Sequence, residues 1–147
     1  MKKSIIIGLL LMIGAAFTLT SCGKYADGPK VSLLSKKSRV ENKWTIEKVL
    51  YTPSGGSQTD ITSNTLSFIG DNTYEFDKDG SYKFTDNSGT DTGTWKLGED
   101  KDDLLTTSSV SGSTEQSARI LKLKSKEMWM KTTASNGDVT EVHYKTK

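Results

Sequence analysis

The stretch TYEFDKDGSYKF, residues 73–84, decides the fold. Its large apolar residues alternate with polar ones on both sides of a central Asp79-Gly80 pair; they are Tyr74, Phe76, Tyr82 and Phe84. Alternation with a period of two is typical of a β-strand that buries one face. An Asp-Gly pair supplies the positive φ that tight hairpin turns need. We therefore predict a β-hairpin whose aromatic face enters a core.

The β pattern extends along most of the chain beyond Trp44, where no segment keeps a helical apolar stripe over three turns. In addition to the two hairpin strands, six strands are expected, over residues 43–51, 90–97, 103–110, 117–124, 127–133 and 140–146. Residues 52–72 are rich in Gly, Ser and Thr, and we expect them to form a long exposed loop. Leu66 and Phe68 could dock that loop onto the body of the domain.

Eight short strands joined mostly by tight connections predict an all-β fold, an eight-stranded antiparallel up-and-down barrel. Closure of the barrel removes the exposed edges that invite aggregation. A β-sandwich is the alternative, but the later loops are too short for its Greek-key crossovers. The inward phase of the strands predicts an interior made of Trp44, Ile46, Tyr74, Phe76, Tyr82, Phe84, Trp95, Leu97, Leu105, Leu121, Leu123, Met128, Met130, Val142 and Tyr144.

The N-terminal segment has the pattern of an export signal. Lys2 and Lys3 precede an apolar run over residues 5–17, which is too short to span a bilayer. The run is followed by Leu19-Thr20-Ser21-Cys22, which resembles the lipobox of bacterial lipoproteins. That resemblance implies cleavage before Cys22, a diacylglycerol on its sulfur and often a further acyl chain such as palmitate on its amine. The alternative is an ordinary signal peptide followed by an incidental cysteine.

This pattern predicts the organisation of the chain: a signal peptide over residues 1–21, a lipidated tether over 22–40 and a barrel domain over 41–147. Gly23 stands where an Asp would retain a lipoprotein in the inner membrane under the enterobacterial sorting rule. We therefore expect the lipid anchor to hold the protein in the cell envelope, at the outer membrane. Whether the domain faces the periplasm or the outside stays open.

The charge of the mature chain excludes one class of partner. The full sequence carries 20 Lys plus Arg against 18 Asp plus Glu, and removal of the signal peptide takes away Lys2 and Lys3 but no acidic residue. The mature domain is therefore close to neutral. Nucleic-acid binding would need a basic face or stripe, so no nucleic-acid partner is expected.

Several stretches of the mature chain resemble the lipocalin-like domains of lipoproteins from Bacteroidetes. They are SKKSRVENKW at 35–44, FDKDGSYKF at 76–84, GTW at 93–95 and ILKLKSKEMWM at 120–130. The resemblance covers almost all of the mature chain. It implies an eight-stranded calyx, open at one end, that holds a small apolar or amphipathic molecule.

The sequence offers little for catalysis. His143 is the only histidine, its phase points it away from the interior, and no serine or cysteine nucleophile motif accompanies it. The acidic stretches DKDG, residues 77–80, and GEDKDD, residues 98–103, lack the spacing of a calcium loop and are expected to be solvated turns. We predict no enzyme activity, no cofactor and no metal. A glycosidase pair drawn from Glu47, Glu75 and Glu127 is the alternative left open.

A small-molecule site inside the barrel is the favoured function. The candidate cavity residues are Trp44, Tyr74, Tyr82, Phe84, Trp95, Met128, Met130 and Tyr144. We expect a shallow apolar pocket near the open end, with hydroxyls of Tyr74, Tyr82 or Tyr144 as its polar groups. If both methionines point inward, Trp129 lies outside, where it could touch a protein partner. The alternative function is a structural or interaction lipoprotein with a filled barrel, acting as an accessory to an envelope complex.

Overall fold

The structure, a computed structural model, describes residues 34–147. The predicted signal peptide, Cys22 and the tether up to residue 33 lie outside the described residues. The described part holds two short helices, α1 (Lys36–Val40) and α2 (Thr62–Ile69). Its strands are β1 (Lys43–Thr52), β2 (Thr59–Asp60), β3 (Thr73–Phe76), β4 (Ser81–Asp86), β5 (Gly89–Leu97), β6 (Asp103–Ser108), β7 (Gln116–Leu123), β8 (Glu127–Thr133) and β9 (Val139–Thr146).

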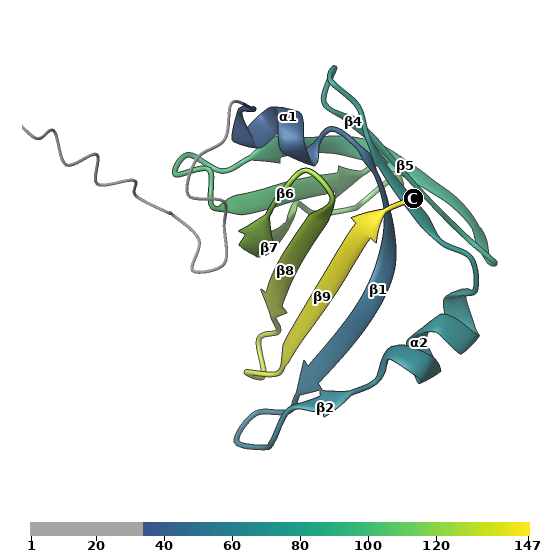
Figure 1. Ribbon diagram of the computed structural model, residues 1–147, viewed down its shortest axis with the longest axis vertical. Coiled ribbons are helices and arrows are strands. Elements are labelled where there is room, and N and C mark those ends of the chain that lie inside the picture. The colour runs from purple at the N-terminus through teal and green to yellow at the C-terminus, as the bar shows by residue number, and fades with distance from the viewer. Residues whose placement is uncertain (1–33) are drawn as a thin grey trace, which may run out of the picture.

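The strands form one antiparallel sheet that closes on itself (Figure 1). From β3 to β9 each strand pairs with the next one along the chain. The first strand then closes the ring, because β1 pairs with β9 on one side and with β3 on the other. The two-residue strand β2 adds to β1 outside this ring. The fold is therefore the predicted eight-stranded up-and-down barrel, with one short extra strand.

The hairpin of β3 and β4 forms as its sequence predicts. Phe76 lies opposite Tyr82, and Tyr74 lies opposite Phe84. Gly80 has a φ of +89°, and the Asp79 carboxylate accepts hydrogen bonds from the backbone N–H and the hydroxyl of Ser81. These bonds stabilise the turn, and the register places the four aromatic rings on one face of the hairpin.

One end of the barrel is filled and closed by α1. The side chains of Val40, Trp44, Leu104, Ile120, Leu123 and Met128 are almost completely buried there. The Trp44 indole N–H donates to the Val40 carbonyl at 2.9 Å, and the Arg39 guanidinium donates to the Leu123 carbonyl at 2.6 Å. Helix α1 thus belongs to the packed body, although its residues lie within the segment predicted as a tether.

Two of the predicted interior positions are wrong, because pairing between neighbouring strands decides which residues of a strand point inward. Leu105 is predicted to point inward, yet Leu104 is the buried residue, and it lies opposite the inward Leu97. Leu121 is also predicted inward, but the β7–β8 pairing shifts register between Ile120 and Lys122. A β-bulge of this kind places one extra residue on one strand and changes which side chains face the core. Ile120 takes the place that the simple alternation assigns to Leu121.

The other predicted interior residues all lie in the core cluster or pack against it. A second bulge, between Ile46 and Lys48 on β1, brings Val49 into the interior, where it is almost fully buried. The alternation along β1 did not identify Val49.

The prediction for residues 52–72 is wrong in part, since they contain β2 and the eight-residue helix α2 and do not form one long loop. The Asp60 carboxylate accepts hydrogen bonds from the backbone N–H and the hydroxyl of Thr62 at the start of α2. The helix buries no side chain, which agrees with the absence of a long apolar stripe from its sequence. Phe68 does not dock on the barrel, because it is 84% exposed, whereas Leu66 is half-buried.

Candidate ligand-binding cavity

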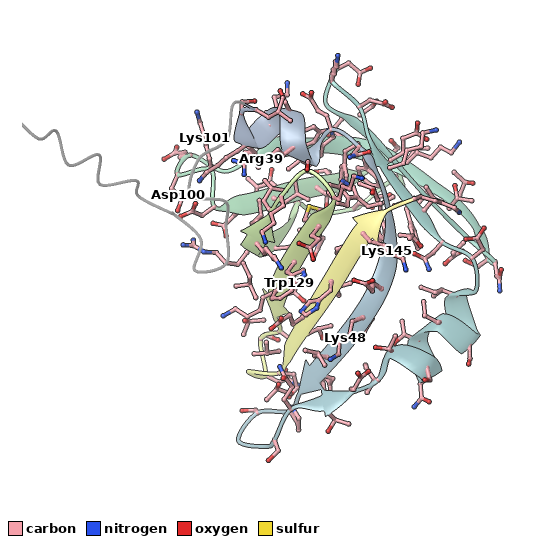
Figure 2. The ribbon with its side chains drawn as sticks, viewed as in Figure 1. Arg39, Lys48, Asp100, Lys101, Trp129 and Lys145 are labelled. Atoms are coloured by element: carbon pink, nitrogen blue, oxygen red, sulfur yellow. The ribbon has the colours of Figure 1, made fainter. Side chains whose placement is uncertain are left out.

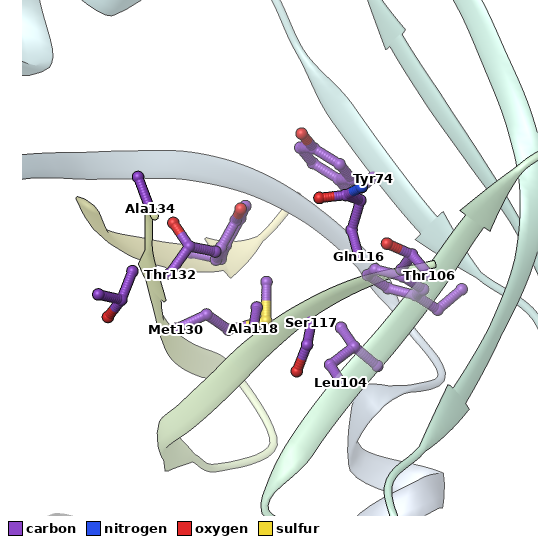
Figure 3. Close-up of a pocket in the computed structure, with 12 residues that line it drawn as sticks. Tyr74, Leu104, Thr106, Gln116, Ser117, Ala118, Met130, Thr132 and Ala134 are labelled. Carbon is purple, nitrogen blue, oxygen red and sulfur yellow. The ribbon is translucent and has the colours of Figure 1, made fainter. Parts of the chain in front are cut away.

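The interior of the barrel holds a cavity of about 440 Å³, on the far side of the packed residues that α1 covers. Its lining residues come from β3, β6, β7, β8 and β9 and from the turn after β8 (Figure 3); they are Tyr74, Phe76, Leu104, Thr106, Gln116, Ser117, Ala118, Met130, Thr132, Thr133, Ala134 and Tyr144. Pockets that bind small molecules commonly have volumes of roughly 300–1,000 Å³. The cavity is therefore large enough for a small ligand.

The cavity opens where β7 and β8 separate. Their pairing begins at the turn that joins them and ends at Arg119 and Lys131. Beyond that point the first residues of β7 pair with β6, and the last residues of β8 pair with β9. In Figure 3, Met130, Thr132 and Ala134 lie on one side of the hollow, and Ser117, Leu104 and Thr106 lie on the other. The mouth is thus a gap in the barrel wall between two diverging strands.

The lining combines apolar walls with uncharged polar groups. Phe76, Leu104 and Met130 supply apolar surface, whereas Thr106 and Thr132 supply hydroxyls. The side chains of the lining residues include no carboxylate, ammonium, guanidinium or imidazole. The cavity can therefore enclose an apolar body and hydrogen bond to a few polar atoms, but it offers no charge.

Tyr74 and Tyr144 form the polar centre of the cavity. Their rings meet edge to face at 5.5 Å between centroids, and the Tyr74 ring also stacks on Phe84 at 4.1 Å. Burial raises the pKa of Tyr74 to about 12 and raises the pKa of Tyr144 well above its ordinary value. Both phenols therefore stay protonated at neutral pH and can donate a hydrogen bond.

The hydroxyls of these two tyrosines face the cavity. Neither forms a hydrogen bond with another residue in the described part of the chain. Over the same residues, no fully buried polar side-chain atom is left without a partner. The two hydroxyls must therefore reach open space, and the space that their residues line is the cavity.

Tyr82 is placed differently from the other two predicted tyrosines. Its hydroxyl donates to the Asp91 carboxylate at 2.6 Å, and the Ser108 hydroxyl donates to the other oxygen of the same carboxylate, also at 2.6 Å. These hydrogen bonds, from Ser108 first and from Tyr82 second, hold the pKa of Asp91 below its ordinary value. Tyr82 is thus tied to the barrel wall and does not line the cavity.

Three of the predicted cavity residues, Tyr74, Met130 and Tyr144, line this cavity together. Trp44, Trp95 and Met128 lie in the packed core. The Trp95 indole N–H donates to the Asp77 carbonyl at 2.9 Å. Phe84 is half-buried beneath Tyr74 and borders a separate hollow at the β4–β5 turn.

Sequence reasoning missed the small polar residues of the lining. Thr106, Thr132 and Gln116 are absent from the predicted interior, because Ser, Thr and Gln on a strand ordinarily mark the outer face. The register supplies the missing signal, since Thr106 is two residues from the inward Leu104 on β6 and shares its face.

Trp129 lies on the outer face of β8, as the inward phase of Met128 and Met130 requires (Figure 2). It is only half-exposed, because its ring stacks on His143 at 4.0 Å and the Lys122 ammonium lies 3.9 Å from its centroid. His143 points outward as predicted and contacts the Glu141 carboxylate. Trp129 is thus held within a polar cluster on the barrel wall.

The described residues offer no metal site, since no group of three or more His, Cys, Asp or Glu gathers there. The three carboxylates considered for glycoside hydrolysis each pair with a different lysine: Glu47 with Lys145, Glu75 with Lys43 and Glu127 with Lys122. Among residues 34–147, no helix has the length and apolar character needed to cross a membrane.

A second hollow, of about 690 Å³, lies outside the barrel beside α1. It is bordered by Lys36, Lys37 and the β5–β6 turn, at the point where the chain continues towards residues 1–33. The Lys36 ammonium at its edge pairs with the Asp102 carboxylate at 3.1 Å. Of the predicted cavity residues, only Trp95 borders this hollow.

No protein-family model matches the sequence, and the search of curated proteins finds no match. Among solved structures, the chain is similar to a de novo designed fluorescence-activating beta barrel. The two are 10% identical, with a TM-score of 0.42, and the match covers 78% of this chain and 100% of the designed one.

Proposed function

We propose that this protein is a lipid-anchored envelope lipoprotein whose lipocalin-like barrel binds a small apolar or amphipathic molecule without catalysing a reaction. The observation that carries the binding function is the cavity of about 440 Å³ with its apolar walls and two cavity-facing phenols. The packed end of the barrel supports it as well, because a rigid core holds the lining residues in place before a ligand arrives.

Binding can be tested with the soluble domain and Prodan, an uncharged naphthalene ketone whose fluorescence shifts in apolar surroundings. We expect Prodan to bind the parent domain. Ala118→Phe should reduce binding at least tenfold, because Ala118 lines the cavity and a phenyl ring would occupy it. Thr107→Phe is the matched control, because Thr107 follows the cavity-lining Thr106 on β6 and so lies on the opposite face.

Equal Prodan binding by the parent and Ala118→Phe, or no binding by either, would overturn the proposed binding function. Both variants must unfold cooperatively, as judged by thermal denaturation, for the comparison to hold.

With the proposed anchor at Cys22, the described part of the chain favours one arrangement at the membrane. Cys22 precedes Ser35 by thirteen residues, and a chain of that length spans at most about 45 Å. The described chain enters the barrel through α1, at the packed end, whereas the mouth lies beyond the Arg119–Lys131 pair towards the other end. This entry point favours an anchor on the side away from the mouth, with the cavity open to the aqueous space. Two or three acyl chains give stable membrane residence where one does not.

Lipidation is tested by membrane fractionation of the full chain. Cys22→Ser should release the protein from the membrane fraction, and globomycin should cause an uncleaved precursor to accumulate. Ser21→Ala is the matched control, because it keeps a small residue before the cysteine, and this variant should stay in the membrane. A Cys22→Ser protein that still fractionates with the membrane would contradict the anchor.

A structural or interaction role within an envelope complex is the second candidate. Phe68 favours it, because this large apolar side chain is 84% exposed on α2, where a partner protein could cover it. A domain that folds but binds no Prodan would favour this interaction role over ligand binding.

A further inference from the structure

We infer that the ligand of the cavity is uncharged and carries a hydrogen-bond acceptor, such as a ketone or ester carbonyl, that Tyr74 and Tyr144 hold through their hydroxyls. This inference rests on the proposed binding function and names the chemical class that the same cavity takes.

The first argument is the absence of a compensating charge inside the cavity. None of its lining residues bears an ionisable acid or base other than the two phenols. Moving an ion from water into such surroundings carries a large desolvation cost that only a paired opposite charge offsets. A carboxylate or ammonium group is therefore a poor occupant of this space.

The basic residues where β7 and β8 separate do not favour an anion either. Arg119 and Lys131, at the foot of the mouth, are directly paired across β7 and β8 and alternate with the inward Ile120 and Met130, so they lie on the outer face. The Arg119 guanidinium already pairs with Asp100, Asp102 and Asp103. Burial first, and then the nearby Tyr82, Asp86 and Asp91, raise the pKa of Tyr74, so the surroundings of its hydroxyl disfavour a negative charge.

The second argument is the supply of donors. The Tyr74 and Tyr144 hydroxyls reach the cavity and bond to no other described residue, so each can donate to a ligand atom. Their rings are fixed, since Tyr74 stacks on Phe84 and Tyr144 packs edge-on against Tyr74. Fixed donors recognise an acceptor at little entropic cost. The apolar walls of Phe76, Leu104 and Met130 then suit the rest of a compact molecule.

The test uses three naphthalene probes of similar size, each measured at neutral pH by displacement of Prodan. They are methyl 2-naphthoate, 2-naphthoic acid, which is the 2-naphthoate anion at this pH, and 2-ethylnaphthalene. The uncharged ester should bind at least tenfold more tightly than the anionic acid. In Tyr74→Phe and Tyr144→Phe, affinity for the ester should fall by about five- to tenfold, as expected for one lost hydrogen bond. Affinity for 2-ethylnaphthalene, which has no acceptor, should stay unchanged in both variants.

Tyr51→Phe is the matched control, because the Tyr51 hydroxyl bonds to Asp138 outside the cavity. This variant should bind all three probes as the parent does. The unchanged binding of 2-ethylnaphthalene separates the loss of a hydrogen bond from a general disturbance of the cavity.

An acid that binds as tightly as the ester, or ester affinity that neither tyrosine substitution changes, would overturn this inference while the binding function stands. Absence of Prodan binding by the parent domain would instead overturn the binding function itself.

Discussion

Gly93 is the residue at which the barrel wall leaves least room for a side chain. A Cβ atom there would lie 2.1 Å from the Thr107 carbonyl oxygen and 2.6 Å from the Tyr82 ring. The first of these neighbours is backbone in a paired strand and cannot move away without breaking the β5–β6 ladder. Gly93 is therefore required by close packing, and its φ lies outside the positive range.

We expect Gly93→Ala to lower the free energy of unfolding by about 2–3 kcal/mol, the cost of forcing extra atoms into a packed site. Urea denaturation measures the change. Gly98→Ala is the control, since its Cβ would meet nothing closer than 3.5 Å and its φ is not positive. Similar losses in the two variants would show that the close approach at Gly93 does not control stability.

The buried tyrosines predict a loss of stability in alkali. The pKa of Tyr74 and of Tyr82 is raised to about 12, in both cases chiefly by burial, against an ordinary value of 10.0. Between these values the unfolded chain has lost phenolic protons that the folded protein keeps. The contribution of these two phenolic protons to the free energy of unfolding is thus complete below pH 10 and is lost as the pH rises towards 12.

The measurement is the free energy of unfolding across this range, together with the ultraviolet absorbance of tyrosinate. Tyr74→Phe should make the decline with pH shallower, because one of the retained protons is gone. A decline of equal slope in the variant and the parent would contradict the assignment to Tyr74.

At the scale of elements, the two helices have opposite roles although both are short. Helix α1 closes the packed end of the barrel, and its Val40 side chain is fully buried. Helix α2 connects β2 to β3, and its Phe68 side chain is exposed to solvent. The size of an apolar side chain therefore does not indicate which of these helices stabilises the fold.

We expect Val40→Ala to cost about 2 kcal/mol in unfolding free energy, from lost burial and the space left behind. Phe68→Ala removes a much larger side chain but should change stability by no more than about 0.5 kcal/mol, because it lies on the surface. Chemical denaturation of the pair checks the contrast. A larger loss from Phe68→Ala than from Val40→Ala would reverse the roles assigned to the two helices.

At the scale of the whole molecule, β9 closes the barrel. It pairs with β1 over its full length and with β8 at every residue except Thr146. Its removal would leave two long unpaired edges, and such edges promote aggregation. The C-terminal strand is therefore needed by strands that lie at the opposite end of the sequence.

Deletion of residues 139–147 should abolish cooperative unfolding and cause aggregation, as measured by thermal denaturation and size-exclusion chromatography. Deletion of Ser111, Gly112 and Ser113 is the control, because these exposed residues lie in the β6–β7 loop outside every strand. That deletion should preserve a monomer that unfolds cooperatively. A folded, monomeric protein without residues 139–147 would show that closure by β9 is dispensable.

The sequence by itself determined the eight strands of the ring, the Asp79-Gly80 turn and the closed barrel, because alternation and turn chemistry act over a few neighbouring residues. It also identified Tyr74, Met130 and Tyr144, whose size and phase leave them no place but the interior.

Only the tertiary structure decided where the interior is filled and where it is hollow. The bulges on β1 and β7 shift the inward phase, the first in the pairing with the distant strand β9 and the second in the pairing with the neighbouring strand β8. The mouth exists because β7 and β8 separate beyond Arg119 and Lys131, which changes the setting of Thr132 without any sign in the local sequence. A cavity depends on how strands far apart in the chain are brought together, so no short stretch of residues can specify it.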